Sequence, residues 1–313
     1  MMKKKTLLLF FICLLALLPE RTLADVVAYV QYDNRTLMFK YGEFTPDGKT
    51  SWDVRQIKEW FWSRRSGQIE MAVFDPSFSD ARPTSCKMWF AGCSNLIAIE
   101  GMENLNTSEV TNMQEMFSGC SKLVGLDLSH FNTANVTRMG SMFSGCSGLT
   151  SLDVSNFNTA NVTSMGSMFS GCFKLSVLDV SNFSTANVTS MGFMFSGCSG
   201  MTSLDVSSFN TANVTDMYGM FQNCSGLTRL DVSGFNTKKV TNMGGMFYCC
   251  SGLTSLDVSH FNTAKVRTMS KMFYGCSSLT SLDVSNFNVT DVPFLSEMFR
   301  DCSNLRTIYC NVA

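Results

Sequence analysis

Residues 149–174 read LTSLDVSNFNTANVTSMGSMFSGCFK, and this stretch of 26 residues decides the fold because close copies of it fill most of the chain. The residue that opens each copy recurs every 26 positions. These positions are Leu123, Leu149, Leu175, Met201, Leu227, Leu253, Leu279 and Leu305. A fixed period of about 20–50 residues is the signature of a solenoid, in which each repeat forms one coil that stacks on the next.

The pattern inside one unit predicts its secondary structure. Apolar and polar residues alternate over 149–155, which favours a short strand with one buried face. Residues 158–161 have the composition of a turn. From Val162 to Cys172 the apolar residues recur at spacings of three and four, which predicts a short helix. The predicted fold class is therefore an α/β solenoid of 26-residue strand–turn–short-helix units.

Gly171 stands where a residue with positive φ is expected, at the C-terminal end of the predicted helix. Glycine or asparagine stands there in six of eight units, and Cys249 and Asp301 stand in the other two. We expect local backbone strain at these two residues. The six are Gly119, Gly145, Gly171, Gly197, Asn223 and Gly275.

Stacking in register turns each repeated apolar position into a ladder. One predicted ladder consists of phenylalanines and another of methionines, which we interpret as flexible core filler rather than as a copper site. The phenylalanines are Phe117, Phe143, Phe169, Phe195, Phe221, Phe247, Phe273 and Phe299. The methionines are Met142, Met168, Met194, Met220, Met246, Met272 and Met298.

Cysteine follows the same repeat. Eight cysteines share one inward position, and we expect buried free thiols because parallel Cβ vectors fit disulfide geometry poorly. They are Cys120, Cys146, Cys172, Cys198, Cys224, Cys250, Cys276 and Cys302. Of the others (Cys86, Cys93, Cys249 and Cys310), Cys86 and Cys93 are the best candidates for a disulfide. The spacing does not resemble a zinc site, and no cofactor or metal is expected.

The chain before the repeats divides into two parts. Residues 1–24 resemble a secretory signal peptide, with basic residues at 3–5 and an apolar run over 7–18, although an uncleaved anchor is an alternative. Nothing in the chain that remains after cleavage is apolar enough to be transmembrane. Residues 25–95 are expected to form a small α+β cap, the alternative being a separate ligand-binding domain.

Within the cap, three strands and one helix are expected. Strands at 26–32 and 36–41 form a hairpin around residues 33–35, residues 52–62 form a helix, and residues 69–74 form a further strand. Residues 96–313 then form the repeat solenoid of about eight units, of which the C-terminal one is incomplete.

Composition and charge exclude several classes of function. The 313 residues carry a formal net charge of −1, whereas a nucleic-acid-binding protein needs a basic face. The two histidines, His130 and His260, share one repeat position five units apart, about 24 Å at the spacing of paired strands. They cannot share a site, and we expect no enzyme.

One row of charged residues is a candidate partner-binding face. Seven aspartates share a strand position whose neighbours point inward, so they should face outward at about 5 Å spacing. Repulsion between like charges there should be offset by serine hydrogen bonds, calcium or a basic partner. The row consists of Asp127, Asp153, Asp179, Asp205, Asp231, Asp257 and Asp283.

The repeat LTSLDVSNFNTANVTSMGSMFSGC of residues 149–172 resembles that of BspA-like leucine-rich-repeat bacterial surface proteins. So do VFDPSFSDARPTS of residues 73–85 and IEGMENLNTSEVTNM of residues 99–113. The resemblance implies a leucine-rich-repeat-like, right-handed coil in a bacterial protein that is secreted or held at the cell surface. It also implies adhesion to, or recognition of, host or neighbouring-cell macromolecules, with a protein or glycoprotein ligand such as host matrix.

An alternative function is that of a structural envelope component that self-associates. The last unit stops partway, and an open strand edge invites pairing.

Overall fold

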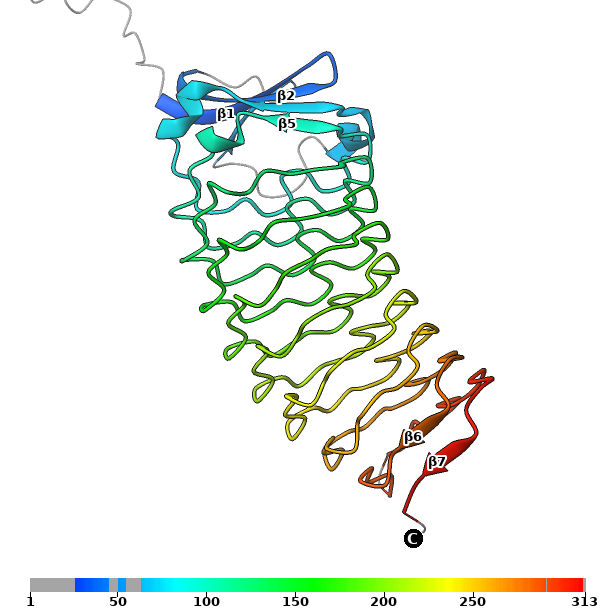
Figure 1. Ribbon diagram of the computed structural model, residues 1–313. Coiled ribbons are helices and arrows are strands. Elements are labelled where there is room, and N and C mark those ends of the chain that lie inside the picture. The colour runs from blue at the N-terminus through cyan, green and yellow to red at the C-terminus, as the bar shows by residue number, and fades with distance from the viewer. Residues whose placement is uncertain (1–25, 45–49, 55–62, 291, 312–313) are drawn as a thin grey trace, which may run out of the picture.

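The computed structural model describes residues 26–44, 50–54, 63–290 and 292–311. They form an elongated, curved stack of coils with a small sheet across its N-terminal end (Figure 1). The predicted signal peptide and residues 55–62 of the predicted cap helix lie outside the described residues.

The N-terminal sheet has five strands in the order β3-β1-β2-β4-β5. The hairpin β1–β2 is antiparallel, β3 adds to β1 in the antiparallel sense, and β4 and β5 follow in parallel. The bounds are β1 Val26–Asp33, β2 Thr36–Glu43, β3 Ser51–Asp53, β4 Met71–Phe74 and β5 Ala98–Glu100. Short 3-10 helices lie at η2 Ser63–Gln68, η3 Pro76–Asp80 and η4 Met102–Asn104.

The predicted hairpin is confirmed, and so is the strand at 71–74. The hairpin turns at Asn34 and Arg35, whose φ values of 40° and 65° are those of a tight turn between twisted strands. The predicted helix at 52–62 is wrong at its start, because Trp52 lies in β3 and pairs with Val30. The division at residue 95 stays a prediction.

An aromatic cluster joins the sheet to the coils. Phe39 stacks on Phe74 and Trp89, with ring centroids 4.4 and 5.3 Å apart. Phe90, 5.7 Å from Phe39, stacks in turn on Phe117 at 5.5 Å. These ring contacts join the sheet to the apolar interior of the first coils.

A continuous ladder of parallel backbone bridges confirms the coil register. Each bridge joins residues that are 26 apart, except the first, which spans 27. The chain of bridges runs through Ser85, Asn112, Arg138, Ser164, Ser190, Asp216, Asn242, Thr268 and Phe294. A bridge between Ser151 and Val177 places Leu152 beside Leu178. Two longer strands, β6 Ser281–Asp283 and β7 Thr307–Tyr309, pair at the C-terminal end.

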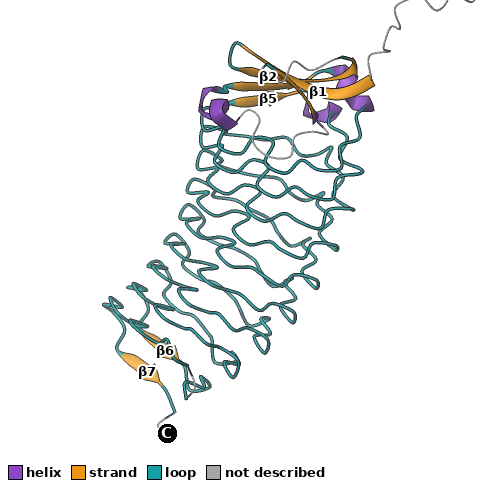
Figure 2. Cartoon of the chain, turned by 180° about the vertical axis from the view of Figure 1, so that it is seen from behind, coloured by secondary structure: helices purple, strands orange, loops and turns teal. Residues whose placement is uncertain are grey.

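The short helix that was predicted in each unit is wrong. Residues 166–171 form consecutive turns, and the coils are drawn almost entirely as loops in Figure 2. The amides of Ser167, Phe169 and Gly171 donate to the next coil, while those of Met168, Ser170 and Cys172 close turns three residues back. Half of the amides are therefore paired between coils, which leaves too few for the hydrogen-bond ladder of an α-helix. The right-handed sense of the coil stays a prediction.

These turns need two left-handed residues in each coil. The Gly171 position has positive φ in all eight units, including Cys249 at 53° and Asp301 at 61°. A second position, four residues earlier, also has positive φ and was not predicted. It holds Glu115, Ser141, Ser167, Phe193, Gly219, Gly245, Lys271 and Glu297.

The interior is a set of aligned side chains. Stacked phenylalanine rings from Phe90 to Phe299 lie 5.5–5.8 Å apart with interplanar angles of 2–9°. The methionines from Met142 to Met272 are fully buried beside them, which confirms their role in the core.

The cysteine ladder consists of free thiols, as predicted. Each Sγ donates to a phenylalanine carbonyl of the preceding coil; for Cys172 the acceptor is Phe143 at 3.2 Å. The expected Cys86–Cys93 disulfide is wrong, since both residues are free and fully buried. Their place in the apolar interior explains why they are cysteines, because free cysteine packs as a small hydrophobic residue.

Candidate partner-binding face

The aspartate row lies on the outside of the stack. Six of the seven side chains are exposed and Asp283 is half-buried. Each carboxylate accepts a hydrogen bond from the amide of the serine two residues later, at 2.9 Å in every coil. Aspartate commonly closes such a local turn. The row is therefore built into the backbone of each coil.

The serine hydrogen bonds also stabilise the charged form of each carboxylate against its charged neighbours. The amide and hydroxyl of Ser155 lower the pKa of Asp153, and the carboxylates of Asp127 and Asp179 raise it by a smaller effect. The pKa values of the other six aspartates are lowered in the same way by their own serines. The serine groups thus offset the repulsion between neighbouring carboxylates.

A second feature beside the aspartates was not predicted. The side-chain amide of Asn182 reaches back to the preceding coil, where its Nδ2 lies 3.1, 2.9 and 3.1 Å from the carbonyl oxygens of Val154, Ser155 and Phe157. Asn156 makes the same contacts one coil earlier, with Leu128, Ser129 and Phe131 at 2.9, 3.2 and 3.0 Å. We call each group of three acceptors a carbonyl triad.

The residue that faces the carbonyl triad differs from coil to coil. The donors at the equivalent positions are Ser208, bonded to Val180 at 3.4 Å, His260, bonded to Val232 at 2.9 Å, and Asn286, bonded to Ser259. Gly234 occupies this position in one coil and has no side chain. The sequence carries one signal that could have revealed the carbonyl triads. The residue at this repeat position changes from asparagine to serine, glycine and histidine between units.

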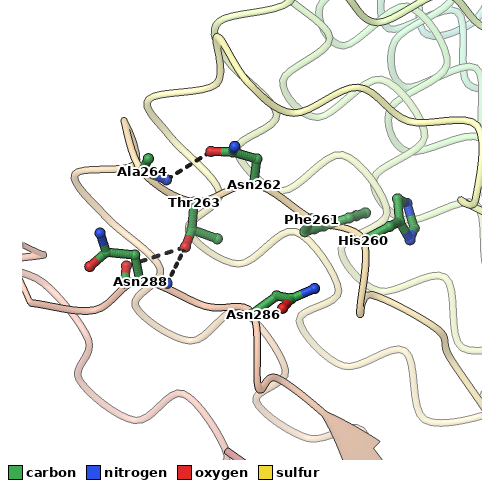
Figure 3. Close-up of a pocket in the computed structure, with 7 residues that line it drawn as sticks. All are labelled: His260, Phe261, Asn262, Thr263, Ala264, Asn286 and Asn288. Atoms are coloured by element: carbon green, nitrogen blue, oxygen red, sulfur yellow. Dashed lines mark hydrogen bonds between the residues drawn. The ribbon is translucent and has the colours of Figure 1, made fainter. Parts of the chain in front are cut away.

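Near His260 the surface has a hollow of about 250 Å³ (Figure 3). Its polar groups are bonded to the stack itself. The hydroxyl of Thr263 donates to the Asn288 carbonyl at 3.2 Å and accepts from the Asn288 amide at 2.7 Å. Asn262 accepts from the Ala264 amide at 3.1 Å. These contacts make it a surface depression between two coils.

The two histidines have separate surroundings. His130 Nδ1 lies 3.1 Å from the hydroxyl of Ser129, while His260 Nε2 lies 2.9 Å from the Val232 carbonyl in another coil. Within the described ranges, no group of three or more His, Cys, Asp or Glu side chains is arranged to hold a metal ion.

The turns that replace the predicted helices carry the least regular surface. Phe193 meets Tyr218 edge to face with centroids 4.9 Å apart, and Tyr248 stacks on Tyr274, also at 4.9 Å. In earlier coils the same positions hold small or polar residues: serine, glycine, glutamine and glutamate. Variation between repeats was the signal for this aromatic group, and sequence reasoning missed it.

No helix among residues placed by the structure is long and apolar enough to cross a membrane.

Inter-coil bridges in a 26-residue register and apolar residues in ladders define a leucine-rich-repeat solenoid. The chain belongs to the family described as "Mycoplasma protein of unknown function, DUF285", which matches residues 84–203, 152–230 and 228–309. A comparison with curated proteins finds no match.

A solved structure shows the same repeat fold. A leucine-rich repeat protein from Bacteroides ovatus has a TM-score of 0.56 and 17% identity, covering 92% of this chain and 70% of its own. This likeness confirms the repeat fold expected from the BspA-like resemblance. A leucine-rich repeat protein from Eubacterium ventriosum has a TM-score of 0.39 and 17% identity, covering 92% of this chain and 83% of its own. A leucine rich cell surface protein from Faecalibacterium prausnitzii has a TM-score of 0.30 and 15% identity, covering 91% of this chain and 93% of its own.

Proposed function

We propose that the chain is a secreted or surface-exposed, non-enzymatic binding protein that recognises a protein or glycoprotein through its aspartate row. The role is adhesion to, or recognition of, host or neighbouring-cell macromolecules, with host matrix as the first class to examine. The observation that carries the proposal is a regular, exposed line of carboxylates, each fixed by its own serine. Such a line attracts a partner with basic groups at matching intervals.

The test begins with a binding screen of the full chain against purified matrix and mucin components by surface plasmon resonance. For a partner that binds, Asp179, Asp205 and Asp231 are replaced together by asparagine, which keeps the acceptor oxygen of the serine turn and removes the charge. Binding should weaken at least tenfold. The affinity of the parent chain should also fall as salt is raised, since screening weakens contacts between exposed charges.

The matched control removes three exposed charges elsewhere. Asp33, Asp80 and Glu109 are exposed, and none of them occupies the repeat position of the aspartate row; their replacement by the matching amides, asparagine and glutamine, changes the net charge equally. Binding that is unchanged in the aspartate variant, or weakened as strongly in the control, contradicts the proposal. A further variant with serine at the three aspartate positions tests whether the partner needs carboxylates or only hydroxyl groups.

A specific observation also supports the alternative, self-association of an envelope component. Among the described residues, β7 pairs only with β6, and Ile308 and Tyr309 are 40% and 57% exposed. We propose that a second copy can pair with this edge. Sedimentation should then show oligomers that grow with concentration in the parent chain and are absent when both residues are replaced by lysine. A parent chain that stays monomeric at high concentration contradicts this alternative.

A further inference from the structure

The carbonyl triad that faces Gly234, on the aspartate face, has no side-chain donor among the described residues. The carbonyls of Val206, Ser207 and Phe209 are equivalent to those that Asn182 and Asn156 fill in other coils, but the facing residue is Gly234. Among the described residues no side chain donates to these three oxygens, and only the Val206 oxygen accepts a backbone amide, that of Phe209 at 3.0 Å. We call this group the open triad.

The filled triads show what the open triad is shaped to hold. Three oxygens lie 2.9–3.2 Å from a single nitrogen, which is hydrogen-bond distance. The side-chain amide of asparagine has only two N–H groups for these three acceptors. A primary ammonium group has three N–H groups on one nitrogen and matches the acceptors in number.

The surrounding charge favours a cation. Asp205 directly precedes the open triad in the chain, and Asp231 lies in the same row, three residues before Gly234. Carboxylates near an exposed site raise the local concentration of cations. A cluster of backbone oxygens converging on one point suits the compact charge of lysine better than the planar, forked guanidinium of arginine.

We propose that the open triad binds the ammonium group of a lysine side chain presented by the partner protein. This inference rests on the proposed function, because it makes the aspartate row the face for a lysine-bearing partner. The open triad then gives a fixed point on a repetitive surface, and it helps to set the register in which the partner binds.

Methylammonium chloride is a direct probe of the open triad. The melting temperature of the full chain is measured in methylammonium chloride and in tetramethylammonium chloride at about 0.5 M, since the second ion has no N–H group. Ligand that binds only the folded state raises the melting temperature by mass action, and we expect methylammonium to raise it by about 2 °C relative to tetramethylammonium. An equal melting temperature in the two salts contradicts the proposal.

Two matched variants locate the effect. Gly234→Asn places a side-chain amide in the open triad and should abolish the difference between the two salts. Ser208→Asn fills the neighbouring triad instead and should leave most of the difference in place. A difference that survives in Gly234→Asn, or that disappears equally in both variants, overturns the assignment.

Glycine labelling gives a second, independent readout. With ¹⁵N-glycine the chain has 22 labelled sites, and the Gly234 signal is identified by its absence from the Gly234→Asn spectrum. The chemical shift of this signal should change and reach a plateau as methylammonium is added, and it should show no such plateau with tetramethylammonium. If methylammonium changes neither the melting temperature nor the Gly234 signal while the triple aspartate variant loses its partner, the proposed function stands and the lysine site is contradicted. If methylammonium binds but no partner depends on the aspartates, the site stands and the proposed function falls.

Discussion

At the scale of single residues, the backbone conformation of the turns limits what each position can hold. Ser167 and Gly171 both have positive φ, at 57° and 73°, and both donate their amides to the next coil. A residue with a Cβ is strained in this region by about 1–2 kcal/mol. The inter-coil hydrogen bonds hold Ser167 there, because leaving the conformation would break its bond to Gly192.

Gly171→Ala should lower the free energy of unfolding by about 1–2 kcal/mol, because alanine is strained at a φ of 73° and its Cβ would lie 3.4 Å from Gly145. Gly166→Ala in the same turn is the control. Its φ is not positive and the new Cβ would make ordinary contacts, so its stability should stay within about 1 kcal/mol of the parent. Urea denaturation of both variants measures the difference. Equal losses would show that crowding, and not φ, sets the cost.

Gly234→Asn should raise the free energy of unfolding by about 1–2 kcal/mol. The new amide gains the hydrogen bonds that Asn182 makes, and the unfolded chain loses the freedom of a glycine. Space is available, since a Cβ at residue 234 would lie 3.7 Å from the nearest atom, the Ser207 oxygen. Urea denaturation again gives the measurement, with Gly125→Asn as the control at a glycine with open surroundings. A gain no larger than that of the control contradicts the prediction.

At the scale of structural elements, a row of buried threonines joins each coil to the next. Thr159 is 1% exposed; its hydroxyl donates to the carbonyl of Ser184 at 3.0 Å and accepts from the amide of the same residue at 2.8 Å. The other members are Thr107, Thr133, Thr185, Thr211, Thr237 and Thr263. One hydroxyl thus satisfies both backbone groups of a residue where the strand ladder is interrupted.

Thr159→Val should cost about 1–3 kcal/mol of unfolding free energy, because it leaves the amide and carbonyl of Ser184 without their partner. Thr159→Ser keeps the hydroxyl and should recover most of the loss. Thermal and urea unfolding of the two variants test this. A valine variant as stable as the parent chain, or a serine variant that loses as much stability as the valine variant, contradicts this prediction.

The aspartate row gives the stack a pH dependence. Hydrogen bonds from serine lower the folded-state pKa of Asp179, Asp205 and Asp231 below the unfolded value of about 3.8. A lowered folded pKa stabilises the fold above the unfolded pKa, and this stabilisation is lost as the pH falls through the folded pKa. The melting temperature should therefore be flat from pH 6 to 5 and fall below about pH 4.

Replacing the three aspartates by asparagine should make the acid limb of this curve shallower, because asparagine does not titrate. Melting temperatures from pH 6 to pH 2 measure it, and the variant with amides at Asp33, Asp80 and Glu109 serves as the control. An acid limb that is unchanged in the aspartate variant contradicts the assignment.

At the scale of the whole molecule, stacking decides which groups solvent can reach. Nine of the twelve cysteines that the structure describes are buried, Cys249 and Cys302 are half-buried, and Cys310 is exposed. Burial raises the pKa of Cys172 to about 12, which leaves very little thiolate at neutral pH.

Iodoacetamide at pH 8 should modify Cys310 first, then Cys249 and Cys302, and reach the nine buried thiols only in denaturant. Mass spectrometry of the intact chain counts the additions. Because each coil is held only by its neighbours, we expect the buried thiols to become reactive together over the urea transition. Rapid labelling of Cys172 in the native chain would show that the coils open locally.

The sequence by itself determined the period, the register and the inside of the stack. Leucine, phenylalanine, methionine and cysteine at fixed positions in a 26-residue unit leave only one arrangement in which every coil buries its apolar side. The outward aspartates followed from the alternation, since their neighbours are apolar. The buried free thiols followed from the spacing that the cysteines share with the apolar residues and from their parallel Cβ vectors.

Only the tertiary structure decided what the second half of each coil is. The spacing of Val162, Met165, Met168 and Cys172 suits one face of a helix, but the glycines and serines between them have little helix propensity. The amides of Ser167, Phe169 and Gly171 bond to the adjacent coil instead of to the same turn. The carbonyl triads depend on the same circumstance, because their acceptors and donors are about a whole repeat apart and meet only when coils stack.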